Sequence, residues 1–509
     1  MTKRLAEDEV DGGVSLKSGE RPQQLQEGNV IENFEDEFED EYESEDEIME
    51  AGVDGRPDQE REIEEKGNAM DIDKRPFIPG RDQLQNGESL APDSSAYDLL
   101  HGLSTTWPCL SFDLLPDSLG DNRKTYPATI YAVAGTQAES YRSRDNELMV
   151  MKLSGLSRTE KKDDSDSDDD ESDEETTEPI LETKSIPMNS TTNRICAHQF
   201  LQTNSSTPPT TLTATMTESA ELLIHDITPH LQSFDRPGMT ITPQHSRPIA
   251  TSKTHRTEGY ALAWSPNHPA GKLLSGDNDG KIFLHSATDA SSPMKWTSDT
   301  RPFTGHESSV EDIQWSPSET NVFASASSDG TIRVWDIRSK SRKPALTVKV
   351  SDTDVNVLSW NKKRDYLLAS GADDGVWAVW DLRSWKSSSG GRSGSSISST
   401  PVAKYDFHKE QITSIEWHPT DDSVVCVTAG DNTMTLWDLG VELDDEEARG
   451  SAAAEGVPPQ LLFLHYLENV KEGHWHPQIP GLVVGTGAGA NGGQLRYVAD
   501  WKGEWEHLY

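Results

Sequence analysis

Cysteine, basic side chains and long apolar runs are all scarce in this chain of 509 residues. Its three cysteines, Cys109, Cys196 and Cys426, are widely spaced and include no CxxC pair. This excludes a disulfide framework and a cysteine zinc site, and it is typical of a reducing compartment. No stretch approaches about 18 apolar residues, and the N-terminus lacks the apolar core of a signal peptide. The sequence therefore predicts a soluble intracellular protein without membrane contact.

The shortage of basic residues gives the chain a strong negative charge. There are 46 Lys and Arg against 88 Asp and Glu, a formal charge of −42. This favours basic proteins as partners and argues against direct, sequence-specific binding of nucleic acid. Two tracts, residues 32–50 and 163–175, supply 22 of the 88 acids, and a third acidic cluster lies at 442–447.

Acidic runs often do no more than keep a chain solvated, but three such segments in one sequence favour a binding role. We expect the following acidic residues to contact a basic client: Glu35, Asp36, Glu37, Glu39, Asp40, Glu41, Asp168, Asp169, Asp170, Glu171, Asp444 and Asp445. Four serines in the first two tracts have an acidic residue three positions later and are candidate sites for an acid-directed kinase: Ser44, Ser165, Ser167 and Ser172. Each phosphate would add about −1.5 to −2 charges.

A repeated pattern organises the second half of the chain. Four segments each combine an apolar strand ending in Trp, a Ser/Ala/Gly-rich apolar run, an acidic turn and a further apolar run. The Trp residues recur at intervals of 51, 45 and 57 residues: Trp264, Trp315, Trp360 and Trp417. In three of the four segments the last run ends in Trp-Asp. A period of about 45 with this dipeptide is typical of four-stranded β-propeller blades.

Recurring polar residues predict a hydrogen-bond network inside these blades. Two blades share a His, a Trp 29 residues later and an Asp six residues before that Trp: His306, Asp329 and Trp335 in one, His408, Asp431 and Trp437 in the other. We expect the His to bind the Asp and, through a strand hydroxyl such as Ser327, the indole N–H, because a buried Trp needs a partner for that group. The two other blades keep part of the set: His255 and Asp279 with His285 in place of Trp, and Asp374 and Trp380 with Ser351 in place of His.

Weaker repeats extend the pattern on both sides. Residues 210–227 end in His-Asp where Trp-Asp would stand, and residues 469–487 begin a blade that closes without that dipeptide. With the strand pair in 126–156, these segments predict an all-β, seven-bladed WD-repeat propeller, with six or eight blades as alternatives. We expect the early strand 109–115 to complete the sheet that the C-terminal segment begins.

The composition divides the chain into a disordered acidic tail at 1–73, an N-terminal segment at 74–106 and the propeller at 107–509. A short helix is expected within 90–103, with Tyr97, Leu100 and Leu103 on one face. The propeller carries a disordered acidic insertion at 157–180, a Ser/Gly loop at 385–400 and an acidic Pro-Pro loop at 440–460. We place the tract 163–175 in the connection between the first and second blades.

Several motifs invite an enzymatic interpretation, but repetition favours a structural one. His474 and His476 could form a metal pair, yet His476 occupies a position that holds Ser or His in other blades. The Gly-rich run at 486–493 lacks the Lys-Ser/Thr of a phosphate-binding loop, so it reads as a turn. His306, Asp329 and a Ser recur in a second blade, unlike a catalytic triad. We therefore expect no catalytic, cofactor-binding or metal-binding residue and no enzyme; a hydrolase has no support in the sequence.

A family resemblance is carried by five segments in order: RPFIPG, AYDLLHGLSTTWPCLSFDLL, YPATIYAVAGTQA, NELMVMKLSGL and EGHWHPQIPG. From about residue 75 to the end, the chain resembles the glutamate-rich WD-repeat family of ribosome assembly proteins. That family belongs to a wider group that includes histone-binding WD-repeat proteins. The resemblance implies a nuclear and nucleolar chaperone that holds a basic large-subunit ribosomal protein of the L-three family and delivers it to pre-60S particles.

The histone-binding relatives imply a client surface built from the N-terminal helix and the Pro-Pro loop. The corresponding residues are Tyr97, Leu100, Leu103, Asp444, Asp445, Pro458, Pro459, Leu461 and Phe463. The helix is shorter and less charged than in those relatives. A histone chaperone or chromatin scaffold is the alternative function. A further alternative is a substrate adaptor of a ubiquitin ligase, because Arg338 in WDIR and Arg383 in WDLR resemble an adaptor-docking motif.

Overall fold

The computed structural model describes residues 77–78, 81–82, 90, 92–159, 178–200, 209–289, 292–385, 397–441, 457–489 and 492–499. The chain divides into two compact units, Met1–Arg75 and Pro76–Tyr509, and all described residues belong to the second. The acidic and serine residues predicted as functional in the tracts 32–50, 163–175 and 442–447 lie outside the described residues. Within the described residues no helix is long and apolar enough to cross a membrane.

The described strands form seven sheets, which we number as blades in chain order. The first four contain the following strands, given from the first to the last in sequence: β2 (Cys109–Leu115), β3 (Ala128–Thr136), β4 (Glu147–Leu156) and β5 (Ile180–Pro187) in blade 1; β6 (Thr192–Phe200), β7 (Thr210–Thr217), β8 (Leu222–Asp226) and β9 (Ala250–Ser252) in blade 2; β10 (Leu262–Trp264), β11 (Lys272–Gly276), β12 (Lys281–Asp289), β13 (Ser292–Ser298) and β14 (Phe303–Thr304) in blade 3; β15 (Val310–Trp315), β16 (Val322–Ser327), β17 (Thr331–Asp336), β18 (Leu346–Lys349) and β22 (Ile397–Ser398) in blade 4.

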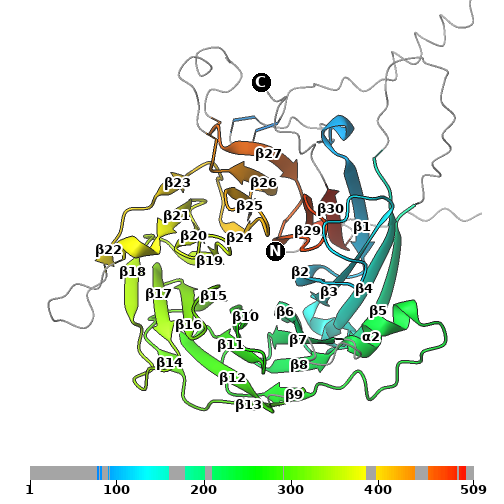
Figure 1. The fold of residues 1–509 in the computed structure, drawn as a ribbon, viewed down its shortest axis with the longest axis horizontal. Coiled ribbons are helices and arrows are strands. Elements are labelled where there is room, and N and C mark those ends of the chain that lie inside the picture. Colours follow the sequence, from blue (N-terminus) through cyan, green and yellow to red (C-terminus); the bar gives the residue numbers. More distant parts are fainter. Residues whose placement is uncertain are drawn as a thin grey trace, which may run out of the picture. The chain divides into compact units, whose positions relative to one another are not determined.

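The remaining three blades and the helices follow: β19 (Val355–Trp360), β20 (Leu367–Ala372), β21 (Trp377–Asp381) and β23 (Ala403–Tyr405) in blade 5; β24 (Ile412–Trp417), β25 (Val424–Ala429), β26 (Thr433–Asp438) and β27 (Leu461–Tyr466) in blade 6; β28 (Glu472–Trp475), β29 (Leu482–Gly489), β30 (Gly492–Ala499) and β1 (Leu99–Thr105) in blade 7; and the helices η1 (Ser94–Ala96), η2 (Ser140–Asp145), α2 (Thr228–Asp235) and η3 (Leu382–Ser384). The blades follow one another around a ring (Figure 1). The predicted β-propeller is therefore confirmed.

The apolar core lies in the gaps between neighbouring blades. Trp377 of β21 in blade 5 and Trp437 of β26 in blade 6, for example, meet edge to face with their ring centroids 5.2 Å apart, and both are fully buried. The strands that face these gaps are rich in β-branched and small side chains, which suit a pleated and closely packed sheet. Each blade is thus stabilised mainly by its neighbours, and the ring needs its last blade to be complete.

Blade 7 is completed by a segment that the sequence predicts as a helix. Residues 94–96 form only a short 3-10 turn, and β1 follows it, pairing antiparallel with β30 from Leu99 opposite Ala499 to Thr105 opposite Gly493. The helix prediction for 90–103 is wrong, and so is the prediction that 109–115 completes the last sheet, because that segment is β2 of blade 1. The free edge of β30 needs backbone partners, and this demand outweighs the weak helical pattern.

The acidic tract 163–175 lies within a blade and not between two blades. Its flanking strands, β4 and β5, pair with each other from Glu147 opposite Pro187 to Ser154 opposite Ile180. The predicted position between blades 1 and 2 is therefore wrong. The apolar run that ends the third strand of blade 1 resembles the end of a blade, and the tract hides the fourth strand that follows it.

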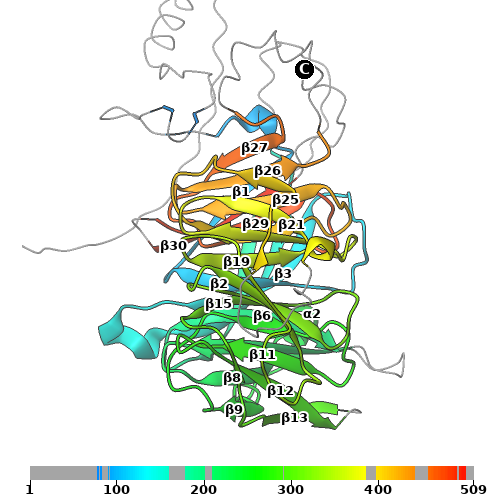
Figure 2. The ribbon, with the colours of Figure 1, turned by 90° about the vertical axis from the view of Figure 1, so that its left-hand side faces the viewer.

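The two ends of the blades define two faces. In a four-stranded antiparallel blade, the turns after the first and third strands lie at one end, and the turn after the second strand and the connection to the next blade lie at the other. We call the first end the α2 face, because α2 follows β8, the third strand of blade 2, and lies at one side of the ring seen edge-on (Figure 2). The strands that flank residues 160–177, 386–396 and 442–456 also meet these segments at the α2 face.

Carboxylates link the innermost strands of neighbouring blades. These strands have one edge without a paired strand, and its N–H groups need acceptors. Four side chains accept from backbone N–H groups of an adjacent blade: Asp113 from Ala197 (2.7 Å), Asp312 from Leu358 (2.9 Å), Glu416 from Trp475 (3.1 Å) and Glu472 from Phe112 (3.0 Å). Removal from water raises the pKa of Asp113 and of Asp312 to about 6. These acids are part of the scaffold.

Candidate protein-interaction surface

The two halves of the predicted client surface, the N-terminal segment and the segment after the Pro-Pro pair, lie side by side. The Tyr97 hydroxyl forms a hydrogen bond of 2.8 Å with His465 Nδ1, and the Tyr97 ring meets Phe463 edge to face at 5.3 Å. Only 5% of Tyr97 is exposed. Tyr97 therefore anchors the segment before β1 to β27 and presents little surface to a client.

The other two residues of the predicted helix face are separated. Leu100 packs on the cluster that contains Trp475, between blades 6 and 7, whereas Leu103 packs on the cluster that contains Phe112, between blades 7 and 1. Alternate side chains of a strand point to opposite sides, so the spacing of three residues places them on different sides of β1. The expectation of a single Tyr97–Leu100–Leu103 face is therefore wrong.

The segment after the acidic loop begins with a turn. Leu461 N donates to Pro458 O at 3.0 Å, which places Pro459 at an exposed corner before β27. Leu461 is half-buried, on the cluster that contains Trp437, and Ile78 packs on the same cluster. Ile78 belongs to the RPFIPG motif, whose anchoring role the sequence reasoning missed; an apolar triplet beside a long acidic tail is the signal that could have revealed it.

A charged cluster joins blades 2, 6 and 7 around the propeller axis. Arg194 Nη1 lies 2.5 Å from Glu472 Oε1, and His474 lies between Glu416, at 3.0 Å, and Glu472, at 3.5 Å. Burial alone would lower the pKa of His474, but its hydrogen bonds with the two carboxylates outweigh burial and raise the pKa to about 10. His474 is thus held as an imidazolium between two carboxylates, an ionic link rather than a metal ligand pair.

The other half of the predicted metal pair caps a turn. His476 Nδ1 accepts hydrogen bonds from the backbone N–H groups of Gln478 (3.1 Å) and Ile479 (3.0 Å). His418 does the same in blade 6 for Thr420 and Asp421. Within the described ranges no group of three or more His, Cys, Asp or Glu side chains could hold a metal ion.

The predicted polar network is present in blade 4 with a different serine. His306 bonds Asp329 at 2.9 Å and Ser325 Oγ at 2.7 Å, and Trp335 Nε1 donates to the same Ser325 Oγ at 2.8 Å. The prediction of Ser327 in this role is wrong, because Ser327 points two positions further along β16 and accepts from Asp329 N. Burial lowers the pKa of His306, which keeps this histidine neutral.

Equivalent networks recur in other blades. In blade 6, His408 bonds Asp431 at 3.2 Å and Thr435 at 3.1 Å, and Thr435 accepts from Trp437 Nε1 at 2.8 Å. In blade 5, where Ser351 replaces the His, Trp380 Nε1 still donates to Ser370 at 2.8 Å. The recurrence and burial of these groups make them structural.

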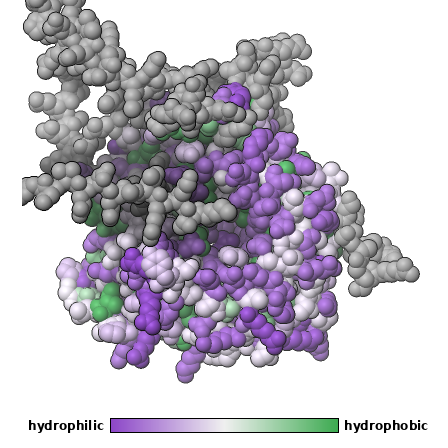
Figure 3. Space-filling view, turned by 180° about the vertical axis from the view of Figure 1, so that it is seen from behind, coloured by the Kyte–Doolittle hydropathy of each residue, from purple (hydrophilic) through white to green (hydrophobic). Residues whose placement is uncertain are grey.

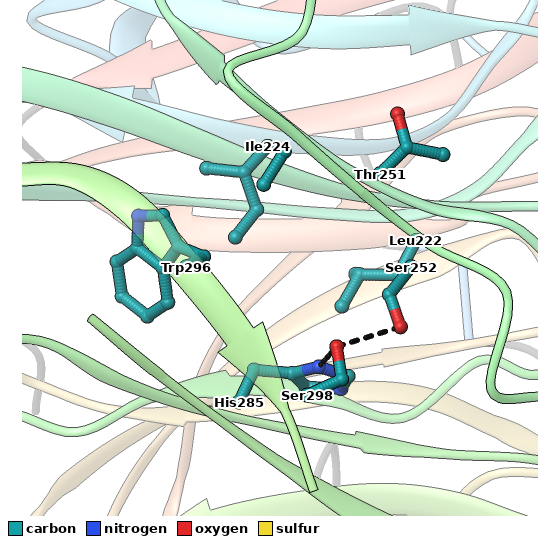
Figure 4. Close-up of a pocket in the computed structure, with 8 residues that line it drawn as sticks. Leu222, Ile224, Thr251, Ser252, His285, Trp296 and Ser298 are labelled. Carbon is teal, nitrogen blue, oxygen red and sulfur yellow. Dashed lines mark hydrogen bonds between the residues drawn. The ribbon is translucent and has the colours of Figure 1, made fainter. Parts of the chain in front are cut away.

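Blade 3 shows how the network accommodates His285 in place of Trp. His255 binds Asp277 at 2.8 Å, and Ser275 Oγ joins His255 (2.6 Å) to His285 (2.8 Å). The sequence-based choice of Asp279 is wrong, since that carboxylate pairs with Lys281. A cavity of about 30 Å³, enough for one water molecule, lies beside His285 and Ser298 (Figure 4). The smaller imidazole leaves this space, so the cavity is a packing consequence.

The two arginines of the adaptor-docking motif have matching geometry. Arg338 forms a bidentate pair with Asp336, and Arg383 with Asp381, the shortest N–O distances being 2.7 and 2.6 Å. Their side chains are 67% and 65% exposed. Each arginine therefore caps its own blade and still presents N–H groups to solvent, and adaptor docking stays a prediction.

The described surface is mostly polar. Large apolar side chains that are well exposed are scattered over several blades: Leu119, Tyr141, Ile180, Met294 and Val402. Hydrophilic residues likewise dominate the described part of the view from behind (Figure 3). A second, open hollow of about 640 Å³ lies beside β5, lined by Lys184 and the loop around Pro243. A partner of this surface would meet mainly charged and polar groups.

Comparison with known proteins places this geometry in a family. The model of the histone-binding protein RBBP4 family, which also covers a component of the CAF1 complex, matches residues 87–157. The model described as "WD domain, G-beta repeat" matches residues 298–336, 342–381 and 399–438. Residues 87–157 span β1 to β4 and include the strand that closes the ring. The matches thus cover both the repeats and the segment that the sequence misread as a helix.

Three relatives resemble the chain over most of its length. Ribosome assembly protein rrb1 of Schizosaccharomyces pombe is 45% identical over 498 residues, covering 96% of this chain and 97% of the relative. Protein HEAT STRESS TOLERANT DWD 1 of Arabidopsis thaliana is 41% identical over 438 residues (82% and 90%), and Glutamate-rich WD repeat-containing protein 1 of Dictyostelium discoideum is 40% identical over 496 residues (94% and 94%). The chain therefore belongs to the family of glutamate-rich WD-repeat proteins and ribosome assembly protein rrb1.

Proposed function

We propose that the protein is a ribosome assembly factor without catalytic activity, acting in the nucleus and nucleolus. It holds a newly made basic large-subunit ribosomal protein of the L-three family and delivers it to pre-60S particles. The observation that carries the proposal is the 45% identity with ribosome assembly protein rrb1 across 96% of the chain. The polar groups that resembled catalytic or metal sites serve the scaffold, and the proposal needs no cofactor.

The charge distribution supplies a mechanism for holding such a client. Ribosomal proteins carry basic extensions that would bind RNA indiscriminately or aggregate before assembly. The tract 163–175 and the cluster 442–447 both join the propeller at the α2 face, so their carboxylates can engage one client from one side. An attraction of this kind is salt-sensitive, and ribosomal RNA, whose charge is denser, can displace it. Tethering the acidic segments to a rigid ring raises their local concentration around the client.

The client-binding residues belong to the same proposal. The exposed corner at Pro459 lies directly after the acidic loop that contains Asp444 and Asp445. We place the contact of a folded client part there, beside the half-buried Leu461 and Phe463, while Tyr97, Leu100 and Leu103 support this surface from within. Acid-directed phosphorylation of Ser165, Ser167 and Ser172 would add charge to the tract and strengthen its hold.

Affinity capture tests the proposal. The tagged full-length chain is recovered from cell extract after nuclease treatment, and the bound proteins are identified by mass spectrometry. A large-subunit ribosomal protein should be enriched over a control in which the tracts 32–50, 163–175 and 442–447 carry Asn and Gln in place of Asp and Glu. Recovery of core histones without any large-subunit ribosomal protein would sink the proposal.

A histone chaperone is the second candidate, and one observation favours it: the family model of histone-binding proteins matches residues 87–157. Against it stands the geometry of that match, in which Leu99–Thr105 form a strand of blade 7. Histone chaperoning predicts direct binding of purified core histones at physiological salt that survives competition by an excess of the ribosomal protein. Loss of histone binding under this competition favours the first candidate.

A further inference from the structure

A group of basic side chains lies on the α2 face of this otherwise acidic protein. It comes from three turns: residues 336–345 after β17, 361–366 after β19 and 381–384 after β21. Together these turns contain eight Lys and Arg but three Asp and no Glu, whereas the whole chain has 46 basic against 88 acidic residues. Because β17 and β21 are third strands and β19 is a first strand, all three turns begin at the same face. We call these turns, in blades 4 and 5, the basic turns.

Three lysines of the basic turns are available to a ligand. Lys340, Lys362 and Lys363 are exposed, and their ammonium groups form no hydrogen bond or ion pair within the described residues. Lys362 acts on the rest of the protein only at a distance, helping to lower the pKa of Glu416 against the effect of burial. These side chains are free to move and carry full charge.

The arginines of the basic turns are held in fixed positions by carboxylates. Arg338 pairs with Asp336, Arg383 with Asp381, and Arg364 with Asp422 of blade 6. A guanidinium has five N–H donors, and one carboxylate uses at most two or three of them. With side chains 67%, 65% and 52% exposed, these arginines keep donors for a second anion.

The central basic turn is rigid. The Asn361 side chain accepts from Lys363 N at 2.9 Å and Arg364 N at 2.8 Å, and donates to Asp422 O at 2.9 Å. Tyr366 joins this turn to the next one, since Arg364 donates to its hydroxyl at 3.2 Å and Arg383 lies over its ring at 3.7 Å. The basic groups of blade 5 are thus presented as a preorganised cluster rather than as a flexible peptide.

We propose that the basic turns bind the phosphate backbone of single-stranded RNA without reading its sequence. Several exposed cations on separate turns match a chain of phosphates, and arginines can bind phosphate oxygens bidentately. No large apolar side chain is exposed in these turns, so the surface offers phosphate contacts and little base stacking. The choice of RNA over DNA rests on the proposed function, because a factor that delivers a client to a pre-ribosomal particle meets RNA there. Backbone binding itself does not rest on it.

The test uses the full chain and a fluorescent single-stranded RNA of about 20 nucleotides, with binding followed by anisotropy from about 50 to 200 mM salt. The double variant Lys362→Gln/Lys363→Gln removes two unpaired charges. Its affinity should fall at least about tenfold at low salt, and the slope of log K against log salt should fall by about 1.4, or about 0.7 for each lost phosphate contact. The loss should be equal for RNAs of different sequence.

The matched control is Lys253→Gln/Lys409→Gln, which removes two exposed lysines from connections between blades on the opposite face. This variant should bind RNA as the unchanged protein does, and thermal unfolding should be the same for all three proteins. Equal RNA affinity of the two variants, or no binding by the unchanged protein, overturns the proposal. So does a basic-turn variant that keeps its RNA affinity but loses nuclear accumulation as a fluorescent fusion, which would assign the Lys-Lys-Arg run to import.

A duplex DNA of the same sequence is the final arm. Binding to DNA at least as tight as to RNA overturns the assignment to RNA. Capture of the ribosomal protein by the basic-turn variant from nuclease-treated extract separates the two proposals, because it reports on the acidic segments alone. Loss of RNA binding with normal client capture supports both.

Discussion

At the scale of single residues, the blades depend on polar side chains that are buried with all their partners. Ser325 shows this most clearly, because one hydroxyl serves both the imidazole of His306 and the indole N–H of Trp335. The serine and both rings are buried, so no water can replace the hydroxyl. Sequence spacing identified the His, Asp and Trp, but not which of two serines in β16 faces them.

Replacing Ser325 tests this assignment. Ser325→Ala leaves two buried ring nitrogens without a partner, so we expect it to lower the free energy of unfolding by about 1 to 3 kcal/mol. Ser327→Ala removes a hydroxyl that serves the turn at Asp329 and should cost less. Urea unfolding followed by tryptophan fluorescence measures both. A larger loss for Ser327→Ala than for Ser325→Ala would contradict the network.

His474 gives a second prediction, in the pH dependence of stability. Its pKa is raised from 6.5 to about 10 in the folded protein, so its charge contributes stability that is full below pH 6.5 and is lost as the pH rises toward 10. The free energy of unfolding should therefore fall between about pH 6.5 and pH 9, and less steeply in His474→Gln. Urea unfolding at several pH values provides the measurement.

His418→Gln is the control for the pH experiment. Burial lowers the pKa of His418, so this residue is neutral over the whole range and its loss should leave the slope unchanged. If His474→Gln and the unchanged protein had parallel pH profiles, the ionic link between Glu416 and Glu472 would not exist as described.

At the scale of elements, the ring is closed by β1, which comes from the opposite end of the sequence to its partner β30. The run LLHGL is too short to distinguish a helix from a strand by its apolar spacing. What decides is the edge of β30, whose backbone groups no other described strand pairs with. The four strong repeats, by contrast, were located correctly because each carries its own strands and turns.

Truncation tests the role of β1. A chain that begins at residue 76 keeps the second compact unit and should fold with an unchanged melting temperature. A chain that begins at residue 106 lacks β1 and the anchor Tyr97. Burial of each large apolar side chain is worth roughly 1.5–3 kcal/mol, so this loss is a large share of the roughly 5–15 kcal/mol that stabilises a typical protein.

Circular dichroism melts and limited proteolysis follow both truncations. The point variant Leu99→Ala, at a residue that is 1% exposed, should cost about 2–5 kcal/mol and separates the effect of packing from that of chain length. A chain from residue 106 that melted like the chain from residue 76 would show that blade 7 closes without β1.

At the scale of the whole molecule, a rigid ring carries acidic segments that are additions to it. The tract 163–175 lies in the connection between β4 and β5, and those strands pair along eight residue positions without it. Loop insertions of this kind change folding free energy only slightly. The scaffold and the charge can therefore be altered separately.

Deleting 163–175 uses this separation. The melting temperature should stay within a few degrees of that of the unchanged protein, while affinity for a basic ribosomal protein weakens and its dependence on salt becomes flatter. Deletion of the neutral loop 386–396, which joins a third to a fourth strand in the same way, is the control and should leave both unchanged. Unaltered affinity after loss of the tract would mean that it only solvates the chain.

The candidate surface could be predicted only in part. The sequence brought Tyr97 and Phe463 into one hypothesis, and they do lie in contact. Their burial could not be foreseen, because it depends on β1 and β27 lying on adjacent blades. The role of Ile78 and the ionic link at His474 were also missed, since each joins residues hundreds of positions apart.

The sequence by itself determined the propeller, the positions of its strongest blades and the separation of acidic segments from the fold. These are properties of local patterns: a repeat of about 45 residues, strand alternation and runs of charge. Only the tertiary structure decided which strand closes the ring, which serine completes the network, within which blade the tract 163–175 lies and which side chains stay exposed. Those outcomes depend on backbone and side-chain groups finding partners across the ring, and no local pattern encodes that pairing.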